Sequence, residues 1–358
     1  MPSKVAVPDH NPEPLAAIFR RLIANTGPIT VQHYMGESNT RYYASRDPLG
    51  DGGDFITAPE ISQMFGELIG LWLADIWTRA GKPLPVHYVE LGPGRGTLAR
   101  DALRSAKRFG LEPQVHFVET SPELRKAQAE AVPLASWHDD LSTLPTDAPL
   151  LLVGNEFLDA LPIRQLVKTD KGWRERMVGL QDDALVGVAG DRPMDAAIPP
   201  RFADAEPGTL IEVCPGSAVV VSEIADRLVE QGGAALLIDY GHDQFRTGST
   251  LQAVRAHHKV AVFDMPGEAD LTAHVDFSTL AEVATARQCR WLGTVGQGPW
   301  LQSLGIDMRA QSLAKASPEH AEAIEQARHR LVSDDQMGTL FKVMGLASPD
   351  WPQGAGFS

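Results

Sequence analysis

Residues 86–103, VHYVELGPGRGTLARDAL, decide the fold. An apolar run ends in the acid Glu90, three glycines follow at every second position, and a helical segment starts at Thr97. Glycines at a strand-to-helix turn let the backbone turn tightly and approach a ligand. The first turn of the helix adds unpaired N–H groups and the positive end of its dipole. The stretch therefore predicts a strand, a ligand-binding loop and a helix.

Three further apolar runs, VHFVET, LLLVGNEF and GGAALLIDYGH, also end in polar residues. Short apolar runs that alternate with helical stretches predict an α/β fold with a parallel sheet. Ligands of such sheets bind at the carboxyl ends of the strands. We therefore expect the polar tips to share one edge of the sheet: Glu90, Glu119, Asn155 and Glu156, and Asp239 and Tyr240.

The pattern changes along the chain and predicts three parts. Residues 1–84 form an N-terminal tail and helical cap, with a helix over 15–27 and a loop over 43–60. Residues 85–162 and 233–358 form the core, with helices near 277–288 and 317–332 and a last strand in GTLFKVMGLA. Residues 163–232 start with an alternating segment that contains a Lys171-Gly172 turn, so they predict a β-rich inserted lobe.

Composition excludes several classes of protein. The 358 residues carry a net charge of −14, which disfavours binding to nucleic acid. The two cysteines, Cys214 and Cys289, lie far apart, and the eleven histidines show no metal-ligand spacing, so we expect no metal site. We expect no membrane span, because no apolar run is long enough for one. The first nineteen residues lack the pattern of a presequence, and we expect a cytoplasmic protein.

The spacing of Gly92, Gly94 and Gly96 separates two classes of cofactor. A dinucleotide loop has the pattern G-x-G-x-x-G, so an NAD-dependent oxidoreductase is the weaker alternative. The pattern G-x-G-x-G after an acid resembles motif I of class I S-adenosylmethionine-dependent methyltransferases. In those enzymes the loop holds the amino-acid end of the cofactor, and an acid at the end of the next strand binds the ribose hydroxyls. Glu119 has this position.

Six segments occur in the order typical of one family: 53–67, 90–98, 118–125, 154–163, 238–241 and 270–277. Together they resemble the MidA family of class I S-adenosylmethionine-dependent methyltransferases, over residues 15 to about 347. The family includes the mitochondrial complex I assembly arginine methyltransferase. The resemblance implies a Rossmann-like methyltransferase sheet with S-adenosyl-L-methionine as cofactor. It also suggests an arginine on a protein as methyl acceptor, with a respiratory-complex subunit as one candidate substrate.

The resemblance implies a cofactor site at the glycine loop and the two strands that follow it. Asp140 and Leu141 take the adenine end, with Trp137 as a stacking wall. The predicted cofactor-binding residues are Glu90, Gly92, Pro93, Gly94, Gly96, Thr97, Leu98, Glu119, Thr120, Asp140 and Leu141.

Acids are expected near the methyl group of the cofactor. They suggest how a cationic guanidinium is held, because a carboxylate both binds and polarises it. Asp54 and Glu60 are predicted to bind the substrate. The predicted catalytic residues are Asn155, Glu156, Asp159 and His274. For Asp159 a turn-capping role stays open, His274 has a structural alternative, and Asp276 is expected to cap the next helix.

These features predict a protein-arginine methyltransferase that uses S-adenosylmethionine. The alternative from another class is an assembly chaperone that binds the cofactor without turnover. Transfer of a labelled methyl group to a protein separates the two. The oligomeric state stays open.

Overall fold

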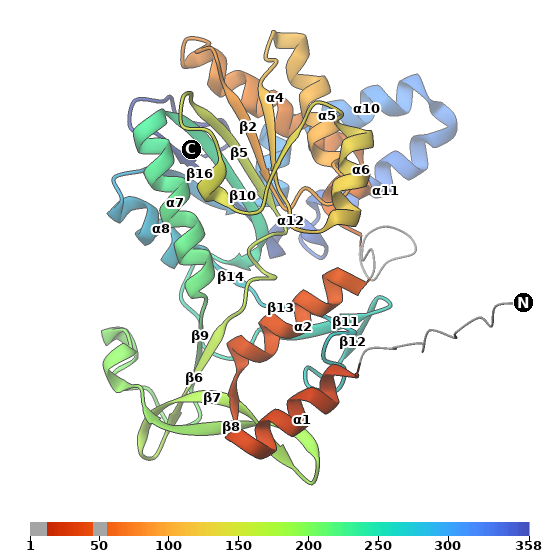
Figure 1. The fold of residues 1–358 in the computed structure, drawn as a ribbon. Coiled ribbons are helices and arrows are strands. Elements are labelled where there is room, and N and C mark those ends of the chain that lie inside the picture. Colours follow the sequence, from red (N-terminus) through yellow and green to blue (C-terminus); the bar gives the residue numbers. More distant parts are fainter. Residues whose placement is uncertain (1–12, 46–55, 358) are drawn as a thin grey trace, which may run out of the picture.

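A mixed eight-stranded sheet forms the centre of the computed structural model, which describes residues 13–45 and 56–357 (Figure 1). β2, β3, β4, β5 and β10 run parallel, whereas β16 is antiparallel to both of its neighbours. The short β14 (Val275–Asp276) adds to β10. The predicted α/β class is confirmed. The strand order is β15 (Arg290–Gly296), β16 (Phe341–Ala347), β10 (Gly233–His242), β5 (Leu150–Asn155), β2 (His87–Leu91), β3 (Gln114–Val118) and β4 (Ser136–His138).

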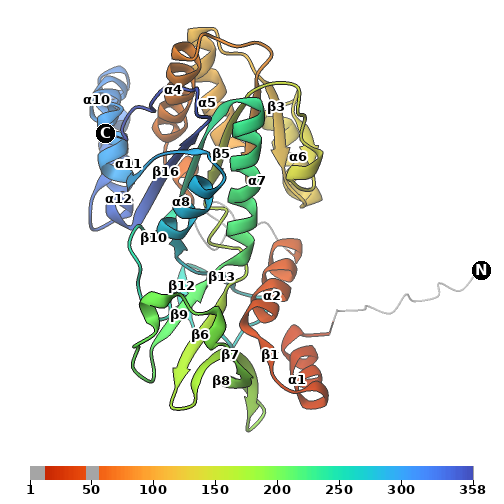
Figure 2. The ribbon, with the colours of Figure 1, turned by 90° about the vertical axis from the view of Figure 1, so that its left-hand side faces the viewer.

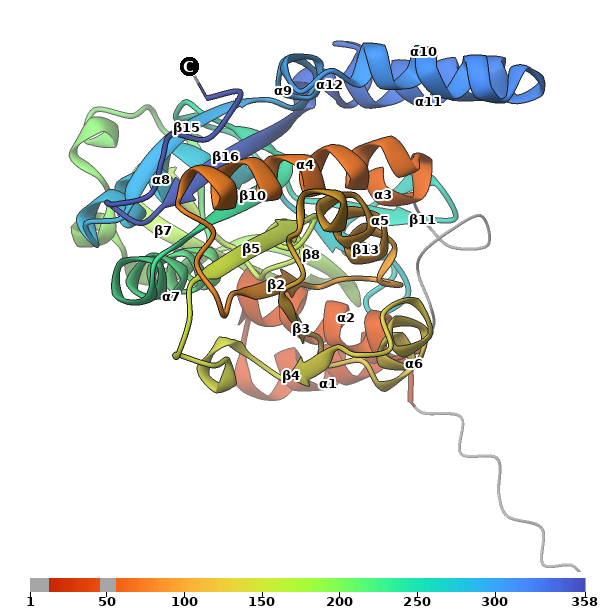
Figure 3. The ribbon, with the colours of Figure 1, turned by 90° about the horizontal axis from the view of Figure 1, so that it is seen from above.

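Helices cover both faces of this sheet, so its central strands are buried on both sides. α7 (Pro215–Gln231) and α8 (Phe277–Ala286) share one apolar core with it. α4 lies on the other face (Figure 3). The helices that share this second core are α4 (Gln63–Arg79), α5 (Thr97–Ala106), α9 (Gln297–Ser303), α10 (Ile306–Ala316), α11 (Ala321–Val332) and α12 (Met337–Leu340).

Two smaller sheets and two helices form a second body beyond the carboxyl ends of the central strands (Figure 2). α1 (Leu15–Thr26) and α2 (Val31–Ser45) share its apolar core with strands from both sheets. The five-stranded sheet places strands in the alternating segment, as predicted, and consists of β1 (Ile29–Thr30), β6 (Arg164–Thr169), β7 (Gly172–Gln181), β8 (Ala184–Pro193) and β9 (Leu210–Val213). The three-stranded sheet consists of β11 (Gln252–Arg255), β12 (His258–Val260) and β13 (Asp270–Thr272).

The domain limits at 84, 162 and 232 stay a prediction. Several elements pack against a different part of the structure than these limits imply. α4 and α7 were placed in the cap and the lobe, but both pack on the central sheet. The strands β11–β13 were placed in the core, but they pack with α1 and α2. α7 packs on the central sheet because its apolar side chains lie on one face of the helix. That face is fully buried and consists of Val221, Ile224, Ala225 and Leu228.

Several local predictions are confirmed. α1 ends before Gly27, whose φ of 86° and N–H bond to Ile23 close the helix. α8, α11 and β16 lie where they were expected, and Asp276 caps α8 by accepting from the N–H of Thr279. The prediction of a loop over 43–60 is wrong at both ends. Residues 43–45 belong to α2, and residues 58–60 belong to α3 (Ala58–Ile61). Its part at 46–55 lies outside the described residues.

Candidate functional site

A cavity of about 710 Å³ lies at the carboxyl ends of β2, β3 and β5. The glycine loop forms one wall, and residues of α2, α3 and α6 (Pro122–Ala131) complete it. Parallel pairing brings the predicted strand tips to this edge. The predicted site residues that line the cavity are Glu60, Glu90, Gly92, Pro93, Gly94, Thr97, Leu98, Glu119, Thr120, Asn155 and Glu156.

The glycine loop has a backbone that side chains would strain. Gly92, Gly94 and Gly96 have φ values of 56°, 55° and 79°, a region that residues with a Cβ rarely adopt. A Cβ on Gly92 would lie 3.0 Å from the ring of Phe157. Gly96 starts α5 without a side-chain cap, so no cap competes for the first N–H groups of that helix. The loop can therefore present bare backbone to an anionic or polar ligand.

Gln128 fixes the shape of this loop, a role that no sequence pattern predicted. The side chain is fully buried and donates from Nε2 to the Gly94 carbonyl at 2.8 Å and to Glu119 Oε2 at 3.2 Å. Its Oε1 accepts from Trp137 Nε1 at 2.8 Å. Trp137, predicted as a wall for adenine, does not line the cavity; it holds Gln128 in place.

Glu119 follows β3 and keeps room for further hydrogen bonds. Its Oε1 accepts from the N–H of Ser121 at 2.8 Å, and its Oε2 accepts from Gln128. Arg125 binds the carbonyl of the same residue. Burial raises the pKa of Glu119, while these hydrogen bonds oppose the shift. Since each carboxylate oxygen has two lone pairs, Glu119 fits the vicinal hydroxyls of a ribose.

Glu90 is buried at the end of β2, with 2% of its surface exposed. The Tyr88 hydroxyl donates to Glu90 Oε2 at 2.5 Å. Burial raises the pKa of Glu90 to about 8 against this hydrogen bond. A bound ammonium group would favour the charged carboxylate again, so Glu90 fits the amino-acid end of the cofactor.

Glu156 directly follows β5 and has a strained conformation, with a φ of 52°. Its Oε1 accepts from the N–H of Ala58 at 3.0 Å and from Asn155 Nδ2 at 3.1 Å. Its Oε2 accepts from none of the described residues, and the buried Oδ1 of Asn155 also has no donor among them. Burial raises the pKa of Glu156 to about 7. The end of β5 therefore offers unfilled acceptors beside the glycine loop.

Glu60, the predicted substrate residue, binds the glycine loop instead of standing free. Its Oε1 accepts from Thr97 Oγ1 at 2.6 Å, at the start of α5. Together with the bond from Ala58 to Glu156, this contact ties α3 to the start of α5 and to the end of β5. α3 therefore lines the cavity between these two points.

Asp239, within β10, shapes the turn that follows Glu156. Its Oδ2 accepts from the N–H groups of Leu158 at 2.9 Å and Asp159 at 3.2 Å. Asp159 is buried behind this turn and does not line the cavity. Burial and the Glu156 charge raise its pKa to about 7, while bonds from Tyr240 and the Ala160 backbone oppose the shift. These contacts favour the structural role that the sequence had left open.

Other predicted residues lie away from the cavity lining. Asp140 is exposed and accepts from the N–H of Ser142, and Leu141 is buried against the α7 side of the sheet. His274 is half-buried, and its Nδ1 lies 3.5 Å from Arg246. Gly96 is the N-cap of α5 and does not line the cavity. Asp54 lies outside the described residues.

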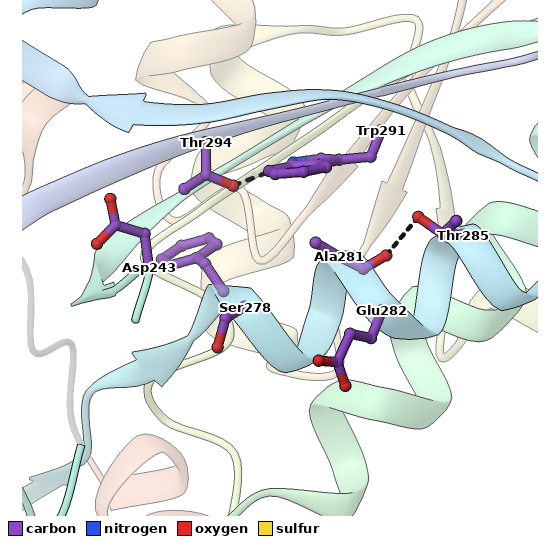
Figure 4. Close-up of a pocket in the computed structure, with 8 residues that line it drawn as sticks. Asp243, Ser278, Ala281, Glu282, Thr285, Trp291 and Thr294 are labelled. Atoms are coloured by element: carbon purple, nitrogen blue, oxygen red, sulfur yellow. Dashed lines mark hydrogen bonds between the residues drawn. The ribbon is translucent and has the colours of Figure 1, made fainter. Parts of the chain in front are cut away.

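A second cavity, of about 530 Å³, lies between α8 and β15 (Figure 4). The Trp291 indole forms its upper side in this view and donates to Thr294 at 3.2 Å. The carboxylates of Asp243 and Glu282 point away from Trp291 in the same view. None of the predicted site residues lines this cavity, so the chemistry is assigned to the first one.

Metal and membrane features were searched for in the described parts of the chain. Within 13–45 and 56–357, no group of three or more His, Cys, Asp or Glu residues has the arrangement of a metal site. In the same ranges no helix combines the length and apolar character that a bilayer span requires.

Comparison with known proteins identifies the family. Residues 68–295, more than half of the chain, match the model of a family described as "Putative S-adenosyl-L-methionine-dependent methyltransferase". The chain belongs to this family of methyltransferases. It is 39% identical to protein arginine methyltransferase NDUFAF7, mitochondrial, of Xenopus tropicalis, over 94% of this chain and 87% of the relative. The human protein of the same name is 37% identical, over 93% and 84%.

A solved structure supports the fold and the cofactor of this methyltransferase. A Burkholderia thailandensis protein, solved with bound S-adenosyl-homocysteine, is 29% identical and superposes with a TM-score of 0.83 over 99% of this chain and 97% of that chain. The cofactor of the family is S-adenosyl-L-methionine, and the MidA resemblance is confirmed. The family is one of methyltransferases and not of NAD-dependent oxidoreductases.

The comparisons also correct one expectation. A cytoplasmic location was expected from the first nineteen residues, but the relatives are named as mitochondrial proteins. The expectation is wrong because a missing presequence pattern does not report the compartment in which the folded chain works.

Proposed function

We propose that this methyltransferase transfers a methyl group to an arginine side chain of a protein, with Glu156 as the residue that binds the guanidinium. One observation carries the proposal: Glu156 lines the cofactor cavity, and its Oε2 has no donor among the described residues. A guanidinium carries five N–H donors and a positive charge. The names of the relatives, which are protein arginine methyltransferases, give independent support.

The bound cofactor supplies a methyl group on a sulfonium, and the chain supplies position and proton handling. Ala58 and Asn155 hold Glu156 Oε1, so the carboxylate cannot rotate freely. Oε2 then grips one N–H of the guanidinium and orients the reacting nitrogen toward the glycine loop. That nitrogen must lose a proton as it gains the methyl group, and Glu156 takes it at Oε2. A pKa of about 7, raised by burial, suits a base at neutral pH.

The substrate proposal extends to the type of protein. The net charge of −14 favours a basic segment as partner. The family resemblance supports a subunit of a respiratory complex, and with it a role in complex I assembly. Both ideas depend on the identity of the methylated protein, which a direct experiment can establish.

The test uses extract from cells that lack the enzyme. The purified enzyme, labelled cofactor and this extract are incubated, and modified peptides are mapped by mass spectrometry. We expect methylarginine on one or a few proteins with wild type and at least a hundredfold less with Glu156→Gln. Glu123→Gln, at an exposed position of the same cavity, is the matched control.

Three outcomes would overturn the proposal. Label that enters only small molecules or RNA would exclude a protein acceptor. Label on proteins that is equally strong with Glu156→Gln would remove this residue from the reaction. Cofactor binding without any transfer would favour the assembly chaperone.

A further inference from the structure

Tyr43 lies at the end of α2 and lines the same cavity as Glu156. Its hydroxyl donates a 2.8 Å hydrogen bond to Asp270 Oδ1 on β13. Asp270 is buried, with 4% of its surface exposed. A phenol has one proton to donate, so this bond leaves the Tyr43 oxygen as an acceptor. None of the described residues donates to that oxygen.

Asn39, one turn earlier on α2, fixes this arrangement. Its Nδ2 donates to the carbonyls of Ala160 at 3.0 Å and Leu271 at 2.8 Å, and its Oδ1 accepts from the N–H of Leu271 at 3.1 Å. These bonds join α2 to β13 and to the turn that follows Glu156. Tyr43 and Asp270 therefore keep their positions relative to the end of β5.

We propose that Tyr43 determines the specificity for arginine, with Asp270 as the residue that keeps the Tyr43 oxygen an acceptor. The inference rests on the proposed arginine methylation. A guanidinium has N–H groups for both Tyr43 and Glu156 and no acceptor of its own. Citrulline has the same shape, but its urea oxygen would meet an acceptor at either residue. Unmatched acceptors in a closed site give strong discrimination.

The test measures binding, so that it does not depend on turnover. Two capped peptides of the form acetyl-Gly-Xaa-Gly-amide, with arginine or citrulline as Xaa, are titrated into protein saturated with S-adenosylhomocysteine. We expect wild type to prefer the arginine peptide at least tenfold. Tyr43→Phe should weaken the arginine peptide about tenfold and leave the citrulline peptide unchanged. Asp270→Ala should reduce the preference about tenfold, because the freed hydroxyl can then donate to the urea oxygen.

Two further variants separate specificity from a merely structural role. Asp270→Asn retains an oxygen for the Tyr43 hydroxyl, so it should restore most of the preference. Tyr34→Phe is the matched control. Tyr34 lies on the same helix as Tyr43 but does not line the cavity, and its hydroxyl donates to the carbonyl of Val262. Affinity for S-adenosylhomocysteine should be the same in all variants. If Asp270→Ala fails to fold, Tyr43→Phe decides.

The outcomes distinguish this inference from the proposed function. Wild type that binds the arginine peptide no better than the citrulline peptide would overturn both. If wild type shows the preference and both Tyr43→Phe and Asp270→Ala keep it, the inference falls and the proposed function stands.

Discussion

The side chain of Gln128 donates a 2.8 Å hydrogen bond to the carbonyl oxygen of Gly94, in the middle of the glycine loop. The same amide group binds Glu119 and Trp137. One buried residue of α6 thus connects the glycine loop with Glu119, the acid predicted to bind the ribose of the cofactor.

The first prediction concerns this connection. Gln128→Met keeps the volume but leaves the Gly94 carbonyl and Trp137 Nε1 without their partner. A buried polar group without a partner costs about 1–3 kcal/mol, so we expect a loosened loop and a dissociation constant for S-adenosylmethionine about tenfold higher. Calorimetry measures it, with Gln326→Met on the exposed face of α11 as control. Unchanged affinity would mean that the loop holds its shape without Gln128.

The second prediction concerns Glu119, the acid that is predicted to bind the ribose. Glu119→Ala removes a charged acceptor, and cofactor binding should weaken by about 1.5–3 kcal/mol. Glu123→Ala is the matched control, because Glu123 lines the same cavity but is an exposed partner of Lys126. If the two variants bind S-adenosylmethionine equally well, the ribose acid lies elsewhere.

The sequence was sufficient where structure depends on local pattern. The apolar run, three glycines and helix of residues 86–103 predict β2, the loop and α5, and the parallel strands bring Glu90, Glu119 and Glu156 to one edge. The role of Gln128 could not be predicted, because it depends on how α6 packs on the loop. A glutamine within a helix has no pattern of its own.

Other misses have equally physical reasons. Asp140 and Leu141 follow a strand of three residues, too short to fix the register of what comes next. α2 was missed because its sequence, VQHYMGESNTRYYAS, has no clear apolar face, yet Tyr34, Met35 and Tyr42 bury fully against different neighbours. Tertiary contacts stabilise this helix.

The third prediction is a pH dependence of cofactor binding. Burial raises the pKa of Glu90 to about 8 in the free protein, whereas an ammonium on the cofactor requires the carboxylate. Binding below pH 8 must therefore release a proton, and the dissociation constant should rise up to about tenfold for each pH unit below 8. Glu90→Gln should bind more weakly at pH 8 and lose this dependence. The same pH profile in Glu90→Gln would assign the proton to another group.

The last prediction concerns three histidines on neighbouring strands. His116 Nε2 lies 3.1 Å from His87 Nδ1, and His116 Nδ1 lies 3.1 Å from His138 Nε2. The outer rings contact Asp147 and Thr143 at 2.9 Å each. This chain of rings crosses β2, β3 and β4, and its central ring has 8% of its surface exposed.

Burial and the two neighbouring histidines lower the pKa of His116 to about 4, against about 6.5 in an unfolded chain. Between these values the unfolded state binds a proton that the folded state does not, so acid favours unfolding in this window. The free energy of unfolding should therefore lose about 1.6 kcal/mol through His116 between pH 6.5 and 5. His116→Phe is less stable at pH 7, because His87 and His138 lose a partner, but its stability should fall less steeply with acid. Urea unfolding at both pH values measures the two slopes, with the exposed His320→Phe as control. Equal slopes in wild type and His116→Phe would show that His116 takes up its proton in the folded protein as readily as in the unfolded chain.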